Sequence, residues 1–225
     1  MSGILYVVAT PIGNLKDITD RAVEVLREAD IVVAENLARA LKLLNHLSIK
    51  KRIISINSYN EERKAQAIVE HLLKGRCCAL ISSAGTPCIS DPGNTIVRKC
   101  HEAGVAVRAI PGPSAAVGAI SISGLYADRF LFFGFLPQKK GKKRKILDDL
   151  LSLPYPIIFF ESPRRLIETL NCIYEKFGNR YVVILKEMTK LHEENFRGSV
   201  EALINQLSIK ELKGEYTIIV HGKER

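Results

Sequence analysis

The sequence predicts an α/β protein of two domains, and three observations support this. Over residues 1–110, short apolar runs alternate with segments of helical periodicity, which is typical of a parallel sheet with helices on both faces. Beyond residue 113 the pattern changes to aromatic and mixed strands, which indicates a second α+β domain of about the same size, with a mixed sheet. Loops rich in Pro and Gly follow several of the early runs, where parallel sheets bind ligands. We therefore expect domains at residues 1–113 and 114–225, with a ligand in the cleft between them.

The first domain is expected to hold five strands. They are predicted at residues 4–9, 31–34, 52–56, 77–81 and 105–110. The runs at residues 4–9 and 77–81 are short and apolar throughout, as in strands that are buried on both faces. The clearest intervening helix follows Asn60, with Glu61 and Glu62 in its first turn and an apolar stripe behind them. Further helices are predicted around residues 22–29, 35–47 and 95–103, the last stopped by a glycine.

The second domain is expected to hold a mixed set of strands. They are predicted at residues 129–134, 156–160, 181–185, 195–198 and 216–220. Ser162 and Pro163 suggest the cap and first position of a helix that extends to Phe177. The basic run at residues 138–145 has two interpretations: a solvated linker, or a surface for a polyanion.

Three loops of similar character follow the first, fourth and fifth predicted strands. Their sequences are TPIGNL at 10–15, SSAGTPCISDPG at 82–93 and PGPSA at 111–115. Gly85 allows close approach of a ligand to the backbone, while Pro87 and Pro92 fix φ and order the loop in advance. The alternative is an ordinary turn-rich connection. Together the loops favour a compact cofactor held by backbone contacts.

Composition narrows the class of protein. The chain has 225 residues, a net charge of +9 and five cysteines without a CxxC pair. We expect a cytoplasmic protein with reduced thiols, no metal site and no membrane span, and the charge suggests a polyanionic partner. The sequence contains no GxGxxG, Walker loop, HExxH or GxSxG motif, which argues against dinucleotide, phosphoryl-transfer, zinc-protease and serine-hydrolase chemistry.

Six collinear segments carry a family resemblance that spans nearly the whole chain. They are ATPIGNL (9–15), AGTPCISDPG (84–93), IPGPSA (110–115), DRFLFFGFLP (128–137), FFESPRR (159–165) and KEMTKLHEENFRG (186–198). The chain resembles the bacterial ribosomal RNA small subunit methyltransferases I, within the tetrapyrrole methylase (class III methyltransferase) fold. The resemblance implies S-adenosylmethionine as cofactor and 2′-O-methylation of a cytidine in the decoding region of 16S rRNA. It further implies a homodimer that acts on the 16S rRNA, within the 30S subunit.

The chain departs from the family pattern at three positions. Asn36 stands where an Asp is usual, Ser83 replaces an acidic residue, and Arg164 replaces a His. These changes affect the segments around the loops, and the cofactor loops themselves keep the pattern.

Site residues follow partly from the resemblance. It implies that the cofactor is lined by Pro11, Ile12, Gly85, Thr86, Pro87, Ile89, Ser114, Ala115, Phe160, Met188, Tyr216 and Thr217. Core packing is the alternative for the apolar members, and helix capping for Ser114. Residues expected to contact RNA are Lys139, Lys140, Lys142, Lys143, Arg144, Arg164 and Lys190.

Candidate proton acceptors follow from position. Glu161 and Glu187 lie at the ends of predicted strands, where side chains often face a site. Lys186 is an alternative base if burial lowers its pKa. A structural ion pair is the competing interpretation for each of them.

Two other functions stay open. One is a methyltransferase of the same fold that acts on a small tetrapyrrole. The other is a non-catalytic RNA-binding module derived from the family, suggested by Asn36 and Ser83. Cofactor binding separates the module from the enzymes, and the identity of the methyl acceptor separates the two enzymes.

Overall fold

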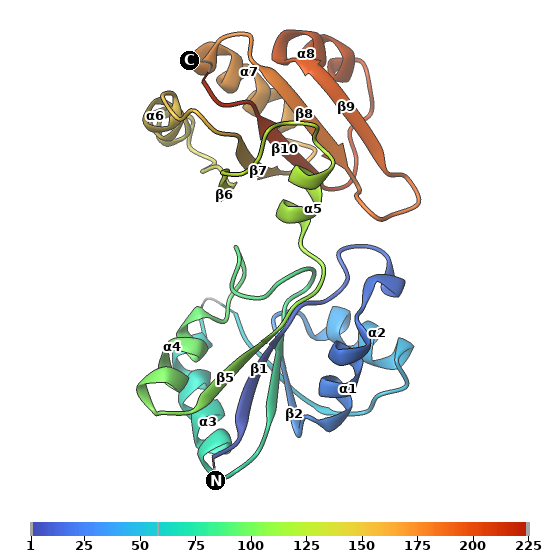
Figure 1. Ribbon diagram of the computed structural model, residues 1–225, viewed down its shortest axis with the longest axis vertical. Helices are drawn as coiled ribbons and strands as arrows, with labels where there is room; N and C mark the ends of the chain where they lie inside the picture. Colours follow the sequence, from blue (N-terminus) through green and yellow to red (C-terminus); the bar gives the residue numbers. More distant parts are fainter. Residues whose placement is uncertain (1, 58, 224–225) are drawn as a thin grey trace. The chain divides into compact units, whose positions relative to one another are not determined.

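The computed structural model describes residues 2–57 and 59–223. Its contacts divide the chain into two units, Met1–Ser114 and Ala115–Arg225, and each has its own sheet (Figure 1). No helix among the described residues is long and apolar enough to cross a membrane.

The first unit is a parallel five-stranded sheet in the order β3-β2-β4-β1-β5. Its strands are β1 (Ile4–Val8), β2 (Ile31–Ala34), β3 (Arg52–Ser55), β4 (Cys78–Ile81) and β5 (Ala106–Ile110). Its helices are η1 (Leu15–Asp17), α1 (Asp20–Glu28), α2 (Leu37–His46), α3 (Glu61–Leu73) and α4 (Asn94–Glu102). The predicted parallel sheet is confirmed, with shifts of at most one residue at strand ends.

Helices cover both faces of this sheet because its strands are apolar on both sides. On one face, Leu26 of α1 and Leu44 of α2 pack with Val32 of β2. On the other, Ile68 of α3 and Ile96 of α4 pack in a second cluster (Figure 1). The sheet therefore exposes its strand ends, and the loops after β1, β4 and β5 all leave from the same edge.

The second unit is a mixed five-stranded sheet in the order β6-β7-β10-β8-β9, in which only β6 and β7 are parallel. Its strands are β6 (Leu131–Phe135), β7 (Ile157–Glu161), β8 (Tyr181–Lys186), β9 (Glu194–Ser199) and β10 (Tyr216–Val220). Its helices are α5 (Ala115–Ser121), α6 (Lys140–Leu150), α7 (Leu166–Phe177) and α8 (Val200–Ser208). The predicted mixed sheet is confirmed as well.

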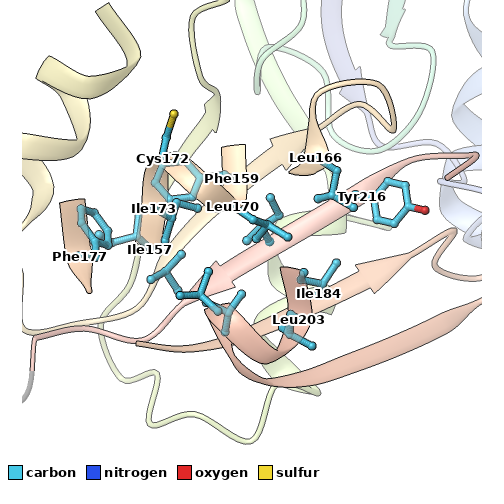
Figure 2. Packing of buried hydrophobic residues seen from close by; sticks show 14 of the residues in the cluster. Ile157, Phe159, Leu166, Leu170, Cys172, Ile173, Phe177, Ile184, Leu203 and Tyr216 are labelled. Atoms are coloured by element: carbon cyan, nitrogen blue, oxygen red, sulfur yellow. The ribbon is translucent and has the colours of Figure 1, made fainter. Parts of the chain in front are cut away.

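The hydrophobic clusters on the two faces of this sheet differ in size. Helices α6, α7 and α8 cover the larger core, in which Phe159 of β7 and Ile184 of β8 meet Leu170 and Leu203 of the helices (Figure 2). The smaller cluster lies under α5 and includes Ile158, Val183 and Ile219. Alternate residues of one strand thus enter different clusters, as the pleat requires.

Three helical features differ from expectation. The basic run is not a linker, because most of it belongs to α6, which begins at Lys140. Helix α8 was not predicted from the sequence. Helix α7 begins at Leu166 with Arg165 as its N-cap, so Ser162 and Pro163 lie in the turn before it. The periodicity that predicts α7 is correct, but the Ser-Pro signal placed its start three residues early.

Candidate cofactor and substrate site

The three predicted loops of the first unit are bonded to one another. The Thr10 amide donates to the Gly85 carbonyl and the Gly85 amide to the Thr10 carbonyl, both at 2.9 Å. The Thr86 hydroxyl donates to the Pro113 carbonyl at 3.3 Å, which joins the loop after β4 to the loop after β5. The loops therefore form one continuous edge at the carboxyl ends of the central strands.

Gly85 occupies a left-handed backbone conformation within this edge. Its φ is +78°, and an added Cβ would lie 3.4 Å from Ile12 Cγ2 and 3.8 Å from the Pro113 carbonyl oxygen. A side chain here would be strained and would fill the space beside both neighbouring loops. The lining at this point is backbone, which suits a cofactor bound through main-chain contacts.

Further bonds hold the long loop after β4. The Ser82 hydroxyl lies 3.2 Å from the carbonyl oxygens of Ala84 and Gly85. At the other end, the Glu61 carboxylate accepts hydrogen bonds from the Gly93 and Thr95 amides at 3.1 and 2.8 Å. Glu61 is 8% exposed and belongs to the first turn of α3, so it stabilises the start of α4 rather than its own helix end.

Asp91, within this loop, and Glu35, just after β2, form an acidic pair that the sequence analysis did not identify. Burial raises the pKa of Asp91 to about 6, and repulsion from the Glu35 carboxylate adds to this effect. A hydrogen bond with the Ser82 hydroxyl lowers the pKa by a smaller amount. The Ser83 hydroxyl donates to Glu35 Oε2 at 2.7 Å. An acidic residue at position 83 would add a further negative charge here, so Ser83 replaces repulsion with a hydrogen bond.

Asn36 also has a structural role. Its side chain accepts a hydrogen bond from the Arg39 amide at 3.1 Å and so caps α2. Asn and Asp are similar in strength as N-caps, so the departure from the family pattern preserves the helix start. Neither Asn36 nor Ser83 therefore points to a damaged site.

In the second unit, the proposed cofactor residues divide between the two faces of the sheet. Phe160 and Met188 pack with the cluster under α5, and Thr217 is the cross-strand partner of Phe160. Tyr216 belongs to the opposite, larger core, with whose residues it is drawn in Figure 2. It is 3% exposed. Burial of Tyr216 favours Thr217, which shares the side of Phe160, as the lining residue of this pair, and the assignment of both stays a prediction.

Met188 lies in a strained turn. Its neighbours Glu187 and Thr189 have φ of +51° and +66°, an unusual conformation for residues with a Cβ. Glu187 Oε1 accepts hydrogen bonds from the Lys190 ammonium and the Glu215 amide, both at 2.8 Å. Burial is the largest single influence and raises the pKa of Glu187, but the hydrogen bonds from Lys190 and the Glu215 amide, with the lysine charges nearby, together outweigh it and lower the pKa. The same bonds hold the turn that carries Met188.

Glu161 is a buried structural residue. Its Oε1 accepts from the Ser162 amide at 2.8 Å, and its Oε2 accepts from the Thr169 hydroxyl at 2.7 Å. Arg165 lies 3.2 Å from the same carboxylate, which is 1% exposed. This enclosure favours the structural interpretation of Glu161, and its role as proton acceptor stays a prediction.

The pKa of Lys186 is raised in this structure, so the expectation that it is lowered is wrong. The Lys186 ammonium donates to Glu194, and this bond raises the pKa of Lys186 despite partial burial. The ammonium is therefore held in its charged form, which cannot accept a proton.

The residues expected to bind RNA fall into two groups. Lys143 is 0% exposed on its side chain and contacts Glu168 at 3.0 Å and Thr169 at 3.1 Å, so a phosphate contact is excluded. Arg144 is paired with Glu175 at 2.7 Å, and Lys190 with Glu187. The exposed basic residues are Lys139, Lys140, Lys142 and Arg164.

The remaining predicted lining residues lie around the loops of the first unit. Pro11, Ile12 and Thr86 are half-buried, Pro87 is buried, and Ile89 is 48% exposed. Ser114 and Ala115 are half-buried at the start of α5. No group of three or more His, Cys, Asp or Glu among the described residues is arranged to hold a metal ion.

Comparisons with known proteins agree with this architecture. Residues 4–204 match the family described as Tetrapyrrole (Corrin/Porphyrin) Methylases. The chain is 45% identical over 222 residues to the ribosomal RNA small subunit methyltransferase I of Thermotoga maritima, covering 99% of this chain and 100% of that protein. It is 42% identical over 228 residues to the protein of the same name from Haemophilus influenzae, covering 100% of this chain and 81% of that protein.

Solved structures share the fold at lower identity. Diphthine synthase has a TM-score of 0.73 at 18% identity, covering 99% of this chain and 90% of that one. Uroporphyrin-III-C-methyltransferase from Thermus thermophilus has a TM-score of 0.67 at 20% identity, covering 97% and 94%. The resemblance that the sequence motifs carry is confirmed: the chain belongs to the tetrapyrrole methylase family and, within it, to the ribosomal RNA small subunit methyltransferases I.

Proposed function

We propose that this chain transfers a methyl group from S-adenosylmethionine to the ribose 2′-oxygen of a cytidine in the decoding region of 16S rRNA. The observation that carries the proposal is the 45% identity to the Thermotoga maritima methyltransferase over that protein's full length. The interlocked loops after β1, β4 and β5 supply a backbone-lined edge of the kind the cofactor requires.

The residues present fit the cofactor. In the first unit, the proposal assigns Pro11, Ile12, Gly85, Thr86, Pro87, Ile89 and Ser114 to its binding. In the second, it assigns Ala115, Phe160, Met188 and Thr217. The left-handed Gly85 leaves main chain at the surface, and Met188 Cε lies 3.9 Å from the position of a Cβ on Gly118, so small residues and soft apolar groups line these positions.

When bound, the cofactor supplies a methyl group on a sulfonium, whose sulfur takes the electron pair of the breaking S–C bond. The ribose oxygen forms the new O–C bond and loses its proton. Binding both reactants in line, with water excluded, carries much of the rate of such a transfer. We propose that this chain contributes chiefly by positioning.

Glu187 is the more accessible of the two carboxylates expected to accept the proton. Its carboxylate is 21% exposed, in contrast to the enclosed Glu161. However, its lowered pKa makes it a weak base, since a general base is most effective with a pKa near the working pH. We therefore assign Glu187 to positioning of the Met188 turn, with water or a phosphate accepting the proton.

The basic start of α6 supports an anionic substrate. Lys139 is the N-cap of α6 without a side-chain capping bond, and Lys140 and Lys142 lie in the first turn. Cations at this end of a helix oppose the macrodipole, whereas phosphates are favoured there. These lysines therefore destabilise the start of the helix slightly, but they are well placed to bind phosphates of the RNA backbone.

The proposal includes a cytoplasmic homodimer. Strand β6 is at the edge of its sheet, and Phe135 at its end is 57% exposed, as is Val117 of α5. Apolar side chains of this size on an edge strand favour a partner surface. Analytical ultracentrifugation of wild type and Phe135→Ser tests this part separately from activity.

The decisive experiment is transfer of labelled methyl from S-adenosylmethionine to 30S subunits, to free 16S rRNA and to a tetrapyrrole. We expect label at a cytidine 2′-oxygen, which nuclease digestion and mass spectrometry identify. Label on the tetrapyrrole alone would contradict the proposal. Calorimetry with the cofactor adds a second criterion, because absence of binding would leave only an RNA-binding module.

A further inference from the structure

A hollow of about 670 Å³ lies at one end of the sheet of the second unit. Its wall includes Tyr181 at the start of β8, His221 and Lys223 just after β10, and Phe177 at the end of α7. Lys186 is at the other end of β8, about 17 Å away along the strand. The hollow is therefore distinct from the end of the sheet that carries Phe160, Met188 and Thr217.

The lining of this hollow is basic. Arg180, His221 and Lys223 contribute to it, and none of the nine residues that line it is Asp or Glu. Ser199, the N-cap of α8, is part of the lining, so the positive end of that helix macrodipole adds to the potential. A surface of this sign attracts an anionic ligand.

The ligand must be held by side chains rather than by the amides of α8. The Glu201 amide donates to the Asn179 side chain at 3.1 Å, and the Ala202 amide to the Ser199 hydroxyl at 3.3 Å. Glu201 is the carboxylate in contact with the rim, through a 3.1 Å hydrogen bond from the Asn179 amide group. Glu201 keeps its negative charge on that side of the rim, so an anion would bind on the side of Arg180 and Lys223, the cations of the lining.

Arg180 is fixed in place. Its guanidinium lies 4.6 Å from the centre of the Phe177 ring and donates to the Leu151 carbonyl at 2.7 Å. Next to it, Tyr181 is 45% exposed, and Lys223 is exposed as well. A planar cation, an open aromatic ring and a flexible ammonium together match the requirements of a nucleotide, with a base to stack and a phosphate to pair.

We propose that this hollow binds one or two nucleotides of the rRNA strand at a distance from the methylated residue, with a base on Tyr181 and a phosphate at Lys223 and Arg180. The inference rests on the proposed function, since it takes the ligand to be part of the same RNA. In this proposal the hollow increases the affinity for the RNA and helps to fix which nucleotide reaches the reaction site. The hollow does not contact the reacting atoms. RNA is favoured over a small anion because the lining pairs cations with exposed aromatic surface.

The test measures binding of a 12-nucleotide single-stranded RNA and of 30S subunits by fluorescence anisotropy across a salt series. Tyr181→Thr keeps a strand-forming residue and should weaken binding about fivefold through lost stacking. Lys223→Gln should reduce the slope of log K against log salt by about 0.7 for the single strand. Cofactor affinity and the single-turnover rate at saturating RNA should stay unchanged.

Matched controls separate the site from general charge and aromaticity. Lys213→Gln removes an exposed lysine of the same unit that is paired with Glu211 at 2.8 Å, and Tyr59→Thr removes a tyrosine that is 98% exposed in the other unit. Neither should change RNA affinity. Equal effects of all four variants, or none in Tyr181→Thr and Lys223→Gln, would overturn the proposal.

A measurement on the wild type guards against unfolded variants. RNA with 4-thiouridine should crosslink to a peptide that contains Tyr181 or Lys223, as mapped by mass spectrometry, and crosslinks only outside this region would contradict the site. These binding readouts do not depend on methyl transfer. An inactive protein whose RNA affinity still falls in the two variants would therefore overturn the proposed function but keep the site.

Discussion

Thr10 and Gly85 exchange two backbone hydrogen bonds of 2.9 Å and so join the loop after β1 to the loop after β4. This reciprocal pair lies beyond the strands themselves, where the chain has left the regular sheet. Because Thr86 is bonded in turn to Pro113, a displacement of Gly85 would move three loops together.

Gly85→Val is therefore expected to abolish S-adenosylmethionine binding in a protein that still folds. The added branched side chain would strain a φ of +78° and press on Ile12 and the Pro113 carbonyl. Calorimetry with the cofactor measures the loss, and thermal unfolding verifies the fold. Gly104→Val is the matched control, because Gly104 has φ of +68° but no atom within 4 Å of its Cβ position. Unchanged cofactor affinity in Gly85→Val would refute the assignment of this loop.

Lys143 should matter for stability and not for RNA. Its ammonium is buried and joins Glu168 to Thr169, and Thr169 in turn donates to Glu161. Lys143→Met should lower the free energy of unfolding by about 1–2 kcal/mol through the lost hydrogen bonds, and Lys143→Glu by more than about 3 kcal/mol through a buried unpaired charge. Urea denaturation measures both. The exposed neighbour provides the comparison: Lys142→Met should stay within about 0.5 kcal/mol of wild type.

Asp91 predicts a particular dependence of stability on pH. Its pKa rises from an ordinary 3.8 to about 6 in the folded protein, so the folded state binds this proton more tightly than the unfolded chain. The contribution of Asp91 is most favourable below pH 4, and is lost as the pH rises through 6. Asp91→Asn should thus be more stable than wild type at pH 7.5, and the difference should disappear near pH 4. Denaturant titrations of both proteins at several pH values measure it, and a constant difference would exclude the titration of Asp91 as its cause.

Gly214 should control the turn that carries Met188. A Cβ on Gly214, whose φ is +89°, would lie 2.5 Å from the Glu187 side chain, which is held there by the Glu215 amide. Gly214→Ala should therefore displace Glu187 and reduce cofactor affinity or single-turnover methylation by at least tenfold, whereas Gly104→Ala carries a similar backbone strain without the clash.

Glu187→Gln complements this test, because an amide oxygen still accepts from Glu215 but no longer carries charge. If Glu187 acts by positioning, the rate should fall less than tenfold with an unchanged pH profile. A loss of 10² or more with a shifted profile would instead identify Glu187 as the base, since that is the range of general base catalysis, about 10² to 10⁴. Lys186→Met and Glu161→Gln extend the comparison to the other two candidates.

The exposed lysines at the start of α6 should govern the salt dependence of RNA binding. Replacing Lys139, Lys140 and Lys142 together by Gln should weaken binding to 30S subunits and reduce the salt slope by about 0.7 to 0.9 per lost phosphate contact. Cofactor affinity should not change. The opposite result, an unaltered slope, would return these residues to the role of a solvated helix face.

Much of the architecture could be predicted from local patterns. The apolar runs that became β2 and β4 are short and unbroken, so they were recognisable as strands buried on both faces, whereas β3 and β5 lie at the edges of the sheet and carry exposed residues. The stripe of α3 and the Pro/Gly loops after β1, β4 and β5 were equally visible, since turn chemistry and periodicity are properties of neighbouring residues.

Local patterns and motifs were therefore enough to predict the order of elements, the family and the position of the loops. Which charged side chains are accessible to a substrate depends on how the elements pack, and local patterns do not contain that information. Lys142 and Lys143 are adjacent in the same basic run, yet one is exposed and the other is enclosed by Thr169 and Glu168 of α7. The reason is physical: burial and ion pairing depend on partners far away along the chain, so the same residue type becomes a surface cation at one position and a core hydrogen-bond donor at the next.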